Sequence, residues 1–141
     1  MEATLTSSLE NLAGSGGPLR AEAPDVAELT GLIRSGRIRL ADAKREANSL
    51  EGRFDLAYNA AHALCLAALR RTGYRAANRY IVFQVLPHTL GLGPEVWRVL
   101  DRCHKLRNQS EYEGELLVDA RIVTDLITAC DAVAAALDRM P

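Results

Sequence analysis

A polar stretch at the expected end of a helix, RNQSEYEG (residues 107–114), brings together a guanidinium group, two amides, a hydroxyl, two carboxyl groups and a phenol. A guanidinium group binds a phosphate through two parallel hydrogen bonds. An amide orients a phosphate or a ribose 2′-hydroxyl. A phenol donates a hydrogen bond or stacks on a base, although its high pKa makes it a poor general base. These groups fit a phosphate-binding site, and they equally fit a solvated helix end.

His104 belongs to the same candidate site. On a helix it shares a face with Arg107, three residues further on, and with Asn108, four residues further on. Tyr112 follows, and Gly114 permits a sharp exit of the chain. In the alternative interpretation, Arg107 and Asn108 cap carbonyl groups at the helix end, and Tyr112 packs over the end of the bundle. The residues alone leave both interpretations open.

Basic side chains gather in two places along the chain. One group lies at the end of the longest helical segment, and the other lies on the helix that carries the polar stretch. The first group is Arg70, Arg71, Arg75 and Arg79, and the second is Arg98, Arg102, Lys105 and Arg107. Such groups neutralise phosphates, or they are solvated faces with acids interspersed. The net charge of -1 argues against a wholly electrostatic nucleic-acid binder.

The length of 141 residues fits one domain with a core of its own. Hydrophobic residues make up 48% of the chain and aromatic residues only 5%, so we expect a core of Leu, Ala, Val and Ile, a composition that favours helices. Residues 1–23 are rich in Ser, Gly and Ala and predict a flexible tail. A single helical domain is expected over residues 24–141.

No sequence pattern predicts a metal, a cofactor or a membrane span. The histidines lack the spacing of a metal-binding motif, and no glycine-rich nucleotide-binding motif is present. The cysteines lack C-x-x-C spacing, and we interpret Cys65, Cys103 and Cys130 as buried thiols in a reducing cytosol. Without a signal peptide or an apolar run of about 18 residues, the chain is expected to be cytoplasmic.

Apolar residues recur at helical spacing along most of the chain. We expect helices from Pro24 to a stop at Ser35 and Gly36, over residues 39–49, from Leu50 to Arg71, over residues 76–86, from Pro94 to residue 110, and from Asp119 to Leu137. The run at 80–86 also has the composition of a strand, but an isolated strand would lack a partner. The expected fold is all-α, an up-and-down bundle of about five helices.

Two segments resemble the HEPN-domain superfamily. FDLAYNAAHALCLAALRRTGYR, residues 54–75, is similar to the long aromatic- and Ala-rich helix of these proteins. LRNQSEYEGE, residues 106–115, is similar to the Arg-polar motif that ends a later helix. The resemblance extends over about residues 25–138 in the same order. It implies a HEPN-like bundle that forms a homodimer, with the two motif regions facing each other across a cleft.

The resemblance also implies a function in RNA metabolism. Many HEPN proteins bind or cleave RNA, and some are toxins paired with a small nucleotidyltransferase antitoxin, so we expect a toxin–antitoxin or defence pair. The enzymatic form would be a metal-independent endoribonuclease. Its candidate catalytic residues are Arg107, Tyr112 and His104, and its candidate RNA-binding residues are Asn108, Arg102 and Lys105. The alternative is a non-catalytic interaction or substrate-binding partner of a nucleotidyltransferase.

One position departs from the family motif, in which Arg and a polar residue are followed after a short spacing by His. Arg107 and Asn108 match the start, but Tyr112 stands where the His is expected, which is similar to a branch of the family that has Tyr there. Cleavage of RNA without a metal requires activation of the 2′-oxygen or protonation of the leaving oxygen. Arg107 can stabilise the phosphorane charge, whereas a phenol only positions or donates. We expect weak or no cleavage unless His104 acts as the base or acid.

Overall fold

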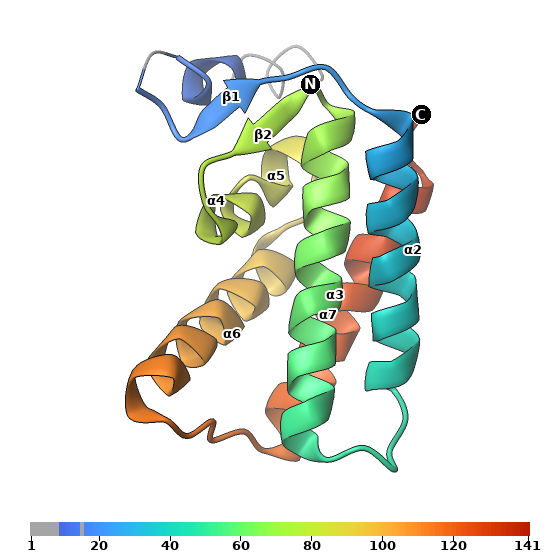
Figure 1. The fold of residues 1–141 in the computed structure, drawn as a ribbon, viewed down its shortest axis with the longest axis vertical. Coiled ribbons are helices and arrows are strands. Elements are labelled where there is room, and N and C mark those ends of the chain that lie inside the picture. The colour runs from blue at the N-terminus through green and yellow to red at the C-terminus, as the bar shows by residue number, and fades with distance from the viewer. Residues whose placement is uncertain (1–8, 15) are drawn as a thin grey trace.

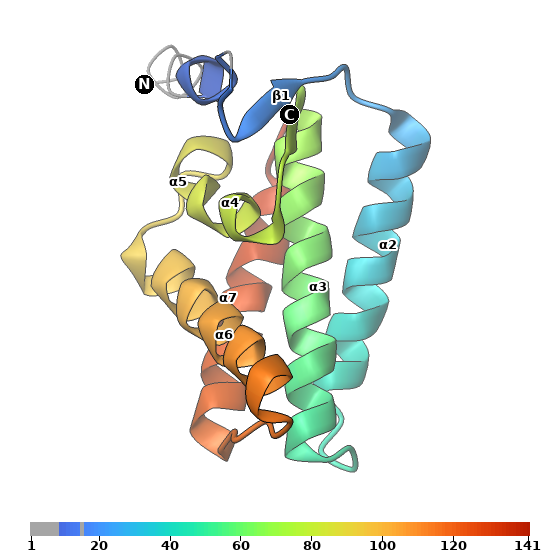
Figure 2. The ribbon, with the colours of Figure 1, turned by 60° about the vertical axis from the view of Figure 1, so that its left-hand side comes forward.

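The computed structural model describes residues 9–14 and 16–141 as a helical bundle. Its long helices run alternately down and up the molecule (Figure 1). They are α2 (Val26–Ala43), α3 (Leu50–Arg71), α6 (Pro94–Glu113) and α7 (Ala120–Asp138). Figures 1 and 2 both show α6 inclined to α3 instead of parallel to it. The predicted all-α class is confirmed.

Helix α3 is the centre of the bundle and has the bounds that its apolar stripe predicted. Ser49 accepts a hydrogen bond from the amide of Gly52 and so caps the first turn. Gly73 follows the last turn with a φ of 93°, in the left-handed region that favours glycine. The core is rich in Ala and Leu, as expected, and Phe54, Tyr58, Leu64 and Leu69 of α3 are fully buried within it.

Helix α2 is one continuous helix, so the prediction of two helices separated at Ser35 and Gly36 is wrong. Gly36 is buried in the middle of α2 and faces α3. A Cβ atom at this position would lie 2.7 Å from Cγ of Leu64. Glycine here therefore permits the close approach of two helices, and the packing offsets the roughly 1 kcal/mol that glycine costs in a helix.

The segment before α6 contains more structure than the single helix expected over residues 76–86. A strand, β2 (Tyr74–Ala76), is followed by the short helices α4 (Arg79–Gln84) and α5 (Leu86–Thr89). The side chain of Asn78 accepts a hydrogen bond from the amide of Ile81 and begins α4. The prediction of helix is therefore confirmed for most of this segment, but it breaks into two pieces near Val85.

Part of the expected N-terminal tail packs on the domain. Strand β1 (Leu19–Ala21) pairs antiparallel with β2, with Leu19 opposite Ala76 and Ala21 opposite Tyr74. Residues 9–12 are helical, and Leu9 and Leu19 are both buried. Figure 2 shows this part of the chain crossing the end of the bundle beside α4 and α5. Residues 1–8 lie outside the described part of the chain.

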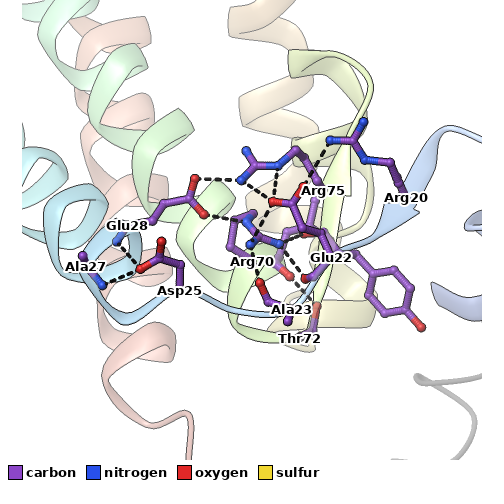
Figure 3. A network of polar contacts seen from close by, with 11 residues as sticks. Arg20, Glu22, Ala23, Asp25, Ala27, Glu28, Arg70, Thr72 and Arg75 are labelled. Atoms are coloured by element: carbon purple, nitrogen blue, oxygen red, sulfur yellow. Dashed lines mark hydrogen bonds and ion pairs between the residues drawn. The ribbon is translucent and has the colours of Figure 1, made fainter.

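A buried arginine joins the chain after β1 to the end of α3 (Figure 3). Arg70 is only 1% exposed, and its guanidinium donates to the carboxylate of Glu28 at 2.6 Å. It also donates to the main-chain carbonyls of Glu22, Ala23 and Tyr74 at 2.9, 2.8 and 3.2 Å. Arg75 pairs with Glu22 and Glu28, and its hydrogen bonds hold the pKa of both carboxyls below the usual range. Arg70 and Arg75, two members of the first basic group, therefore stabilise the fold and are not available to bind phosphate.

The three cysteines are all reduced and buried, as predicted. Burial raises the pKa of Cys103 and of Cys130 to about 12, and it raises that of Cys65 as well. Thiols in such surroundings are protonated at neutral pH and are therefore weak nucleophiles. They act as small apolar side chains of the core.

Candidate functional site

Helix α6 continues past the polar residues that we expected at its end. It extends to Glu113, and Gly114 closes it in a left-handed conformation with its amide 2.8 Å from the carbonyl of Ser110. Arg107 and Asn108 therefore lie within the helix, more than a turn before its last residue. Their side chains contact other side chains of the molecule, so the interpretation of these two residues as caps is wrong.

The imidazole of His104 lies between α6 and α3 with a polar partner at each ring nitrogen. Its Nδ1 is 2.8 Å from Oη of Tyr58, and its Nε2 is 3.0 Å from the side-chain amide of Asn108. The residue is only 8% exposed. Its ring packs against the rings of Tyr58, Tyr80 and Phe83, with centroids 6.1, 5.7 and 5.9 Å away.

Two proton arrangements satisfy this chain of hydrogen bonds. In one, the amide of Asn108 donates to Nε2 of His104, and the Nδ1–H donates to Oη of Tyr58. In the other, the phenol O–H of Tyr58 donates to Nδ1, and the Nε2–H donates to the amide oxygen of Asn108 after a rotation of the amide. The hydroxyl and the amide therefore decide together which tautomer of His104 is present.

Tyr58 completes the site, although the sequence placed it only in the apolar stripe of α3. It is 1% exposed, and its ring packs edge-on against Phe83 at 5.8 Å. A buried phenol needs a hydrogen-bond partner, and in this core His104 is that partner. The available signal in the sequence was the combination of a tyrosine in a buried stripe and a histidine on a second apolar helix.

Arg107 covers the outer side of Tyr58. Its Cζ lies 4.8 Å from the centroid of the phenol ring, a distance at which a cation is attracted to the ring face. Its Nη1 is 3.2 Å from the carboxylate of Glu111, which is mostly exposed. Arg107 also lines an open pocket of about 500 Å³ between the start of α3 and the end of α6. Glu51 and Asp55 contribute further acids to the lining of that pocket.

Desolvation and nearby cations keep the imidazoles of the half-buried His62 and the buried His104 neutral. Burial, and then the cations of Arg79 and Arg107, lower the pKa of His62 to about 4. Burial also lowers the pKa of His104, with Asp101 acting in the opposite direction. Both rings are therefore free bases at neutral pH.

The phenol of Tyr58 also stays in its neutral form. Burial raises its pKa, and Arg79 and Arg107 oppose this rise. Tyr58 and His104 are thus both uncharged at neutral pH and share a hydrogen bond between neutral groups.

The structure separates the remaining candidates from His104. Arg102 and Lys105 lie on another face of α6, beside a pocket of about 440 Å³ that Gln109 and Ile122 also line. Lys105 is paired with Asp101 at 3.0 Å. The structure thus brings His104, Arg107 and Asn108 together, but it does not bring Arg102 or Lys105 to them.

Tyr112 lies in the last turn of α6. The position of its side chain lies outside the described part of the structure.

Among the residues described, no three His, Cys, Asp or Glu side chains converge to hold a metal ion. No helix in this part of the chain is long and apolar enough to cross a membrane.

Comparisons with known proteins add no further assignment. No family model, no curated protein and no solved structure matches this chain. The arrangement of His104, Tyr58, Arg107 and Asn108 is therefore interpreted from its own chemistry, together with the resemblance of the two sequence segments described above.

Proposed function

We propose that the protein is a HEPN-like homodimer of the cytoplasm that binds RNA on the face of α6 that carries Arg107 and Asn108. The observation that supports this function is the chain from Tyr58 through His104 to Asn108, with Arg107 lying over Tyr58. A guanidinium, an amide and an imidazole on one face suit a phosphate and a ribose hydroxyl.

The catalytic form of the proposal assigns His104 as the general base. A neutral imidazole accepts the proton of the 2′-hydroxyl, and the lowered pKa keeps His104 in that form. The 2′-oxygen then bonds to phosphorus, the bond from phosphorus to the 5′-oxygen breaks, and the leaving 5′-oxygen takes a proton from water. Arg107 stabilises the charge of the phosphorane. Asn108 is exposed, so rotation of its side chain frees Nε2 of His104 for this step. Tyr112 stands at the position of the expected motif histidine in the sequence, but it is not assigned as the base, because a phenol has a high pKa.

Binding without cleavage is the second candidate. Both ring nitrogens of His104 already have partners, and burial disfavours the imidazolium that proton abstraction would create. These features favour a non-catalytic partner of a nucleotidyltransferase-type protein in a toxin–antitoxin or defence pair. In that case the same face binds RNA or the partner without a chemical step.

The test compares RNA binding and RNA cleavage by the wild-type protein and by the Arg107→Ala variant. Arg34→Ala is the matched control, because Arg34 is exposed on α2, outside the site, and has the same charge. We expect Arg107→Ala to lower the affinity for single-stranded RNA roughly tenfold and to reduce the salt slope by about one, whereas Arg34→Ala leaves both nearly unchanged.

The results of these assays distinguish cleavage of RNA from binding without cleavage. If the wild-type protein cleaves total RNA and both Arg107→Ala and His104→Gln lose this activity, the result supports the endoribonuclease. Retention of RNA without cleavage supports the binding module. Equal RNA retention by wild type and Arg107→Ala, with no cleavage by either, would contradict an RNA function of this face. Sedimentation of the purified protein tests the homodimer.

A further inference from the structure

Two arginine side chains from different helices reach neighbouring residues of α3. Arg107, on α6, lies over the ring of Tyr58. Arg79, the first residue of α4, has its Nη1 3.5 Å from the side-chain oxygen of Asn59. Tyr58 and Asn59 are consecutive, so the two guanidinium groups approach α3 at one level.

Apolar contacts hold α4 in this position. Phe83 of α4 packs against Tyr58 and also against His62, whose ring centroid is 6.1 Å away. Tyr80, the residue after Arg79, packs against His104. The main chain at Arg79 is therefore fixed relative to α3 and α6 by buried rings, although the guanidinium group itself is exposed.

The carboxylates near these two arginines lie beside Arg107, where Glu51, Asp55 and Glu111 line the open pocket. Among the described residues, no carboxylate forms an ion pair with Arg79; its contact is the neutral amide of Asn59. Arg107 has one carboxylate partner, Glu111, whose side chain is 64% exposed. Both cations act on the buried Tyr58 and His104 and on the half-buried His62, so their fields overlap there. Two cations that converge on uncharged groups favour an anion between them.

Resting on the RNA-binding function proposed above, we propose that Arg79 and Arg107 together clamp the phosphodiester backbone of the RNA across Tyr58 and Asn59. Guanidinium groups bind phosphate oxygens through pairs of hydrogen bonds, and Asn108 adds an amide beside Arg107. Arg79 is a binding residue that the sequence motif does not contain. It arises from a different helix and reaches the site only through the packing of α4.

The acids of the open pocket determine on which side of Arg107 the backbone lies. Glu51, Asp55 and Glu111 all line that pocket, and their carboxylates repel phosphate. On the other side, Arg107 lies over the ring of Tyr58, a residue on which the cation of Arg79 also acts. The backbone therefore follows the Arg79 side, and a phosphate there replaces Glu111 as the partner of Arg107.

The test measures binding of a labelled single-stranded RNA of about 12 nucleotides by fluorescence anisotropy at several salt concentrations. The proteins are the wild type, Arg79→Ala, Arg79→Lys, Arg107→Ala, Glu111→Gln and the control Arg34→Ala. We expect Arg79→Ala to lower the affinity roughly tenfold and to reduce the salt slope by about one, as Arg107→Ala does. Arg79→Lys retains the charge and restores part of the affinity. Glu111→Gln removes the competing carboxylate and raises the affinity.

The results separate failure of the clamp from failure of the RNA function. If Arg79→Ala binds as the Arg34→Ala control does while Arg107→Ala loses affinity, the clamp is overturned and the RNA function stands. If neither Arg79→Ala nor Arg107→Ala changes the affinity, both are overturned. Arg79 is exposed, so its variants should fold, and a circular dichroism melt of each variant verifies this. An equal loss in Arg79→Ala and Arg79→Lys would contradict a role for the charge and would also overturn the clamp.

Discussion

Tyr58 of α3 and His104 of α6 share a hydrogen bond of 2.8 Å inside the core, where both residues are less than a tenth exposed. The bond connects a fully buried phenol to an imidazole whose other nitrogen reaches the exposed Asn108. Packing in the centre of the bundle therefore determines the orientation of the imidazole that Asn108 contacts at the surface. A change in the core beneath Tyr58 is expected to change the properties of the candidate site.

Removal of the Tyr58 hydroxyl tests this coupling. Tyr58→Phe retains the ring but leaves Nδ1 of His104 without a partner inside the core, so we expect the free energy of unfolding in urea to fall by about 1–3 kcal/mol. The nitrogen NMR spectrum of the labelled imidazole should also change, because Nδ1 of His104 loses its hydrogen-bond partner. Tyr74→Phe is the control, because the Tyr74 hydroxyl has no hydrogen bond within the described residues. Equal stability of the two variants and an unchanged His104 spectrum would refute the coupling.

The buried histidines predict a loss of stability in mild acid. In the folded protein, burial and the cations of Arg79 and Arg107 lower the pKa of His62 to about 4, and burial lowers that of His104. In the unfolded chain both titrate near pH 6.5, at about the ordinary value. Below that pH the unfolded state binds more protons, so the free energy of unfolding falls as the pH decreases from about 6.5 towards 4. It should be nearly constant between about pH 7 and pH 8, and it should fall again in stronger base, where thiols of the unfolded chain lose protons that the buried Cys103 and Cys130 retain.

Urea unfolding at a series of pH values between about 7.5 and 5 measures this slope. His62→Gln should flatten it, whereas His88→Gln, which changes a histidine at the far end of α5, should not. The range ends at about pH 5 so that the carboxyls of Glu22 and Glu28 do not affect the slope. Their pKa values lie below the usual 4.5, so their protonation changes the free energy of unfolding only in stronger acid. An identical slope in wild type and His62→Gln would mean that His62 is not held neutral.

The sequence predicted the helices whose signals are local. Helix α3 has a long apolar stripe, a serine cap and a terminal glycine, all of which can be identified without the rest of the chain. Helix α7 likewise begins at Ala120, after its Asp119 cap, within one residue of the expected start at Asp119. Two of the features that the sequence did not predict depend on distant partners. Gly36 normally indicates a helix end, unless another helix packs closely on it, and β1 exists only because β2 lies beside it.

The candidate site was predictable only in part for the same reason. His104, Arg107 and Asn108 lie on one helix, so their spacing showed that they share a face. Tyr58 and Arg79 reach the site from other elements, α3 and α4, and no spacing along the chain relates them to α6. A tyrosine in an apolar stripe is normally a core residue. Tyr58 is a core residue too, but its hydroxyl also forms a hydrogen bond with His104.

Two glycines of α2 provide a paired test of helix packing. Gly36→Ala places a methyl group 2.7 Å from Leu64 Cγ and 3.3 Å from the carbonyl oxygen of Ala60, so α2 must move, and we expect a loss of about 1–3 kcal/mol in the free energy of unfolding. Gly31→Ala meets no atom within 4 Å and should stabilise the protein by up to about 1 kcal/mol. Urea unfolding compares the two, and a stabilising Gly36→Ala would show that α2 does not depend on this close contact.

Arg70 should be the most important single side chain for the attachment of β1. Arg70→Met retains much of the apolar stem but leaves the carbonyls of Glu22 and Ala23 and the carboxylate of Glu28 without this partner (Figure 3). We expect a loss of about 3–5 kcal/mol in the free energy of unfolding, because the guanidinium is fully buried. Arg20→Met, which removes an exposed cation paired with Glu22, should change it far less.

Hydrogen exchange locates the effect of Arg70→Met. The amide of Glu22 donates to the carbonyl of Gly73, and that of Ala77 donates to the carbonyl of Pro18, so these two amides report on the pairing of the strands. In Arg70→Met both should exchange faster than amides in the middle of α3, because β1 separates from β2 before the bundle opens. Unchanged protection of Glu22 and Ala77 alongside reduced global stability would mean that Arg70 stabilises the whole bundle and does not specifically hold the strand.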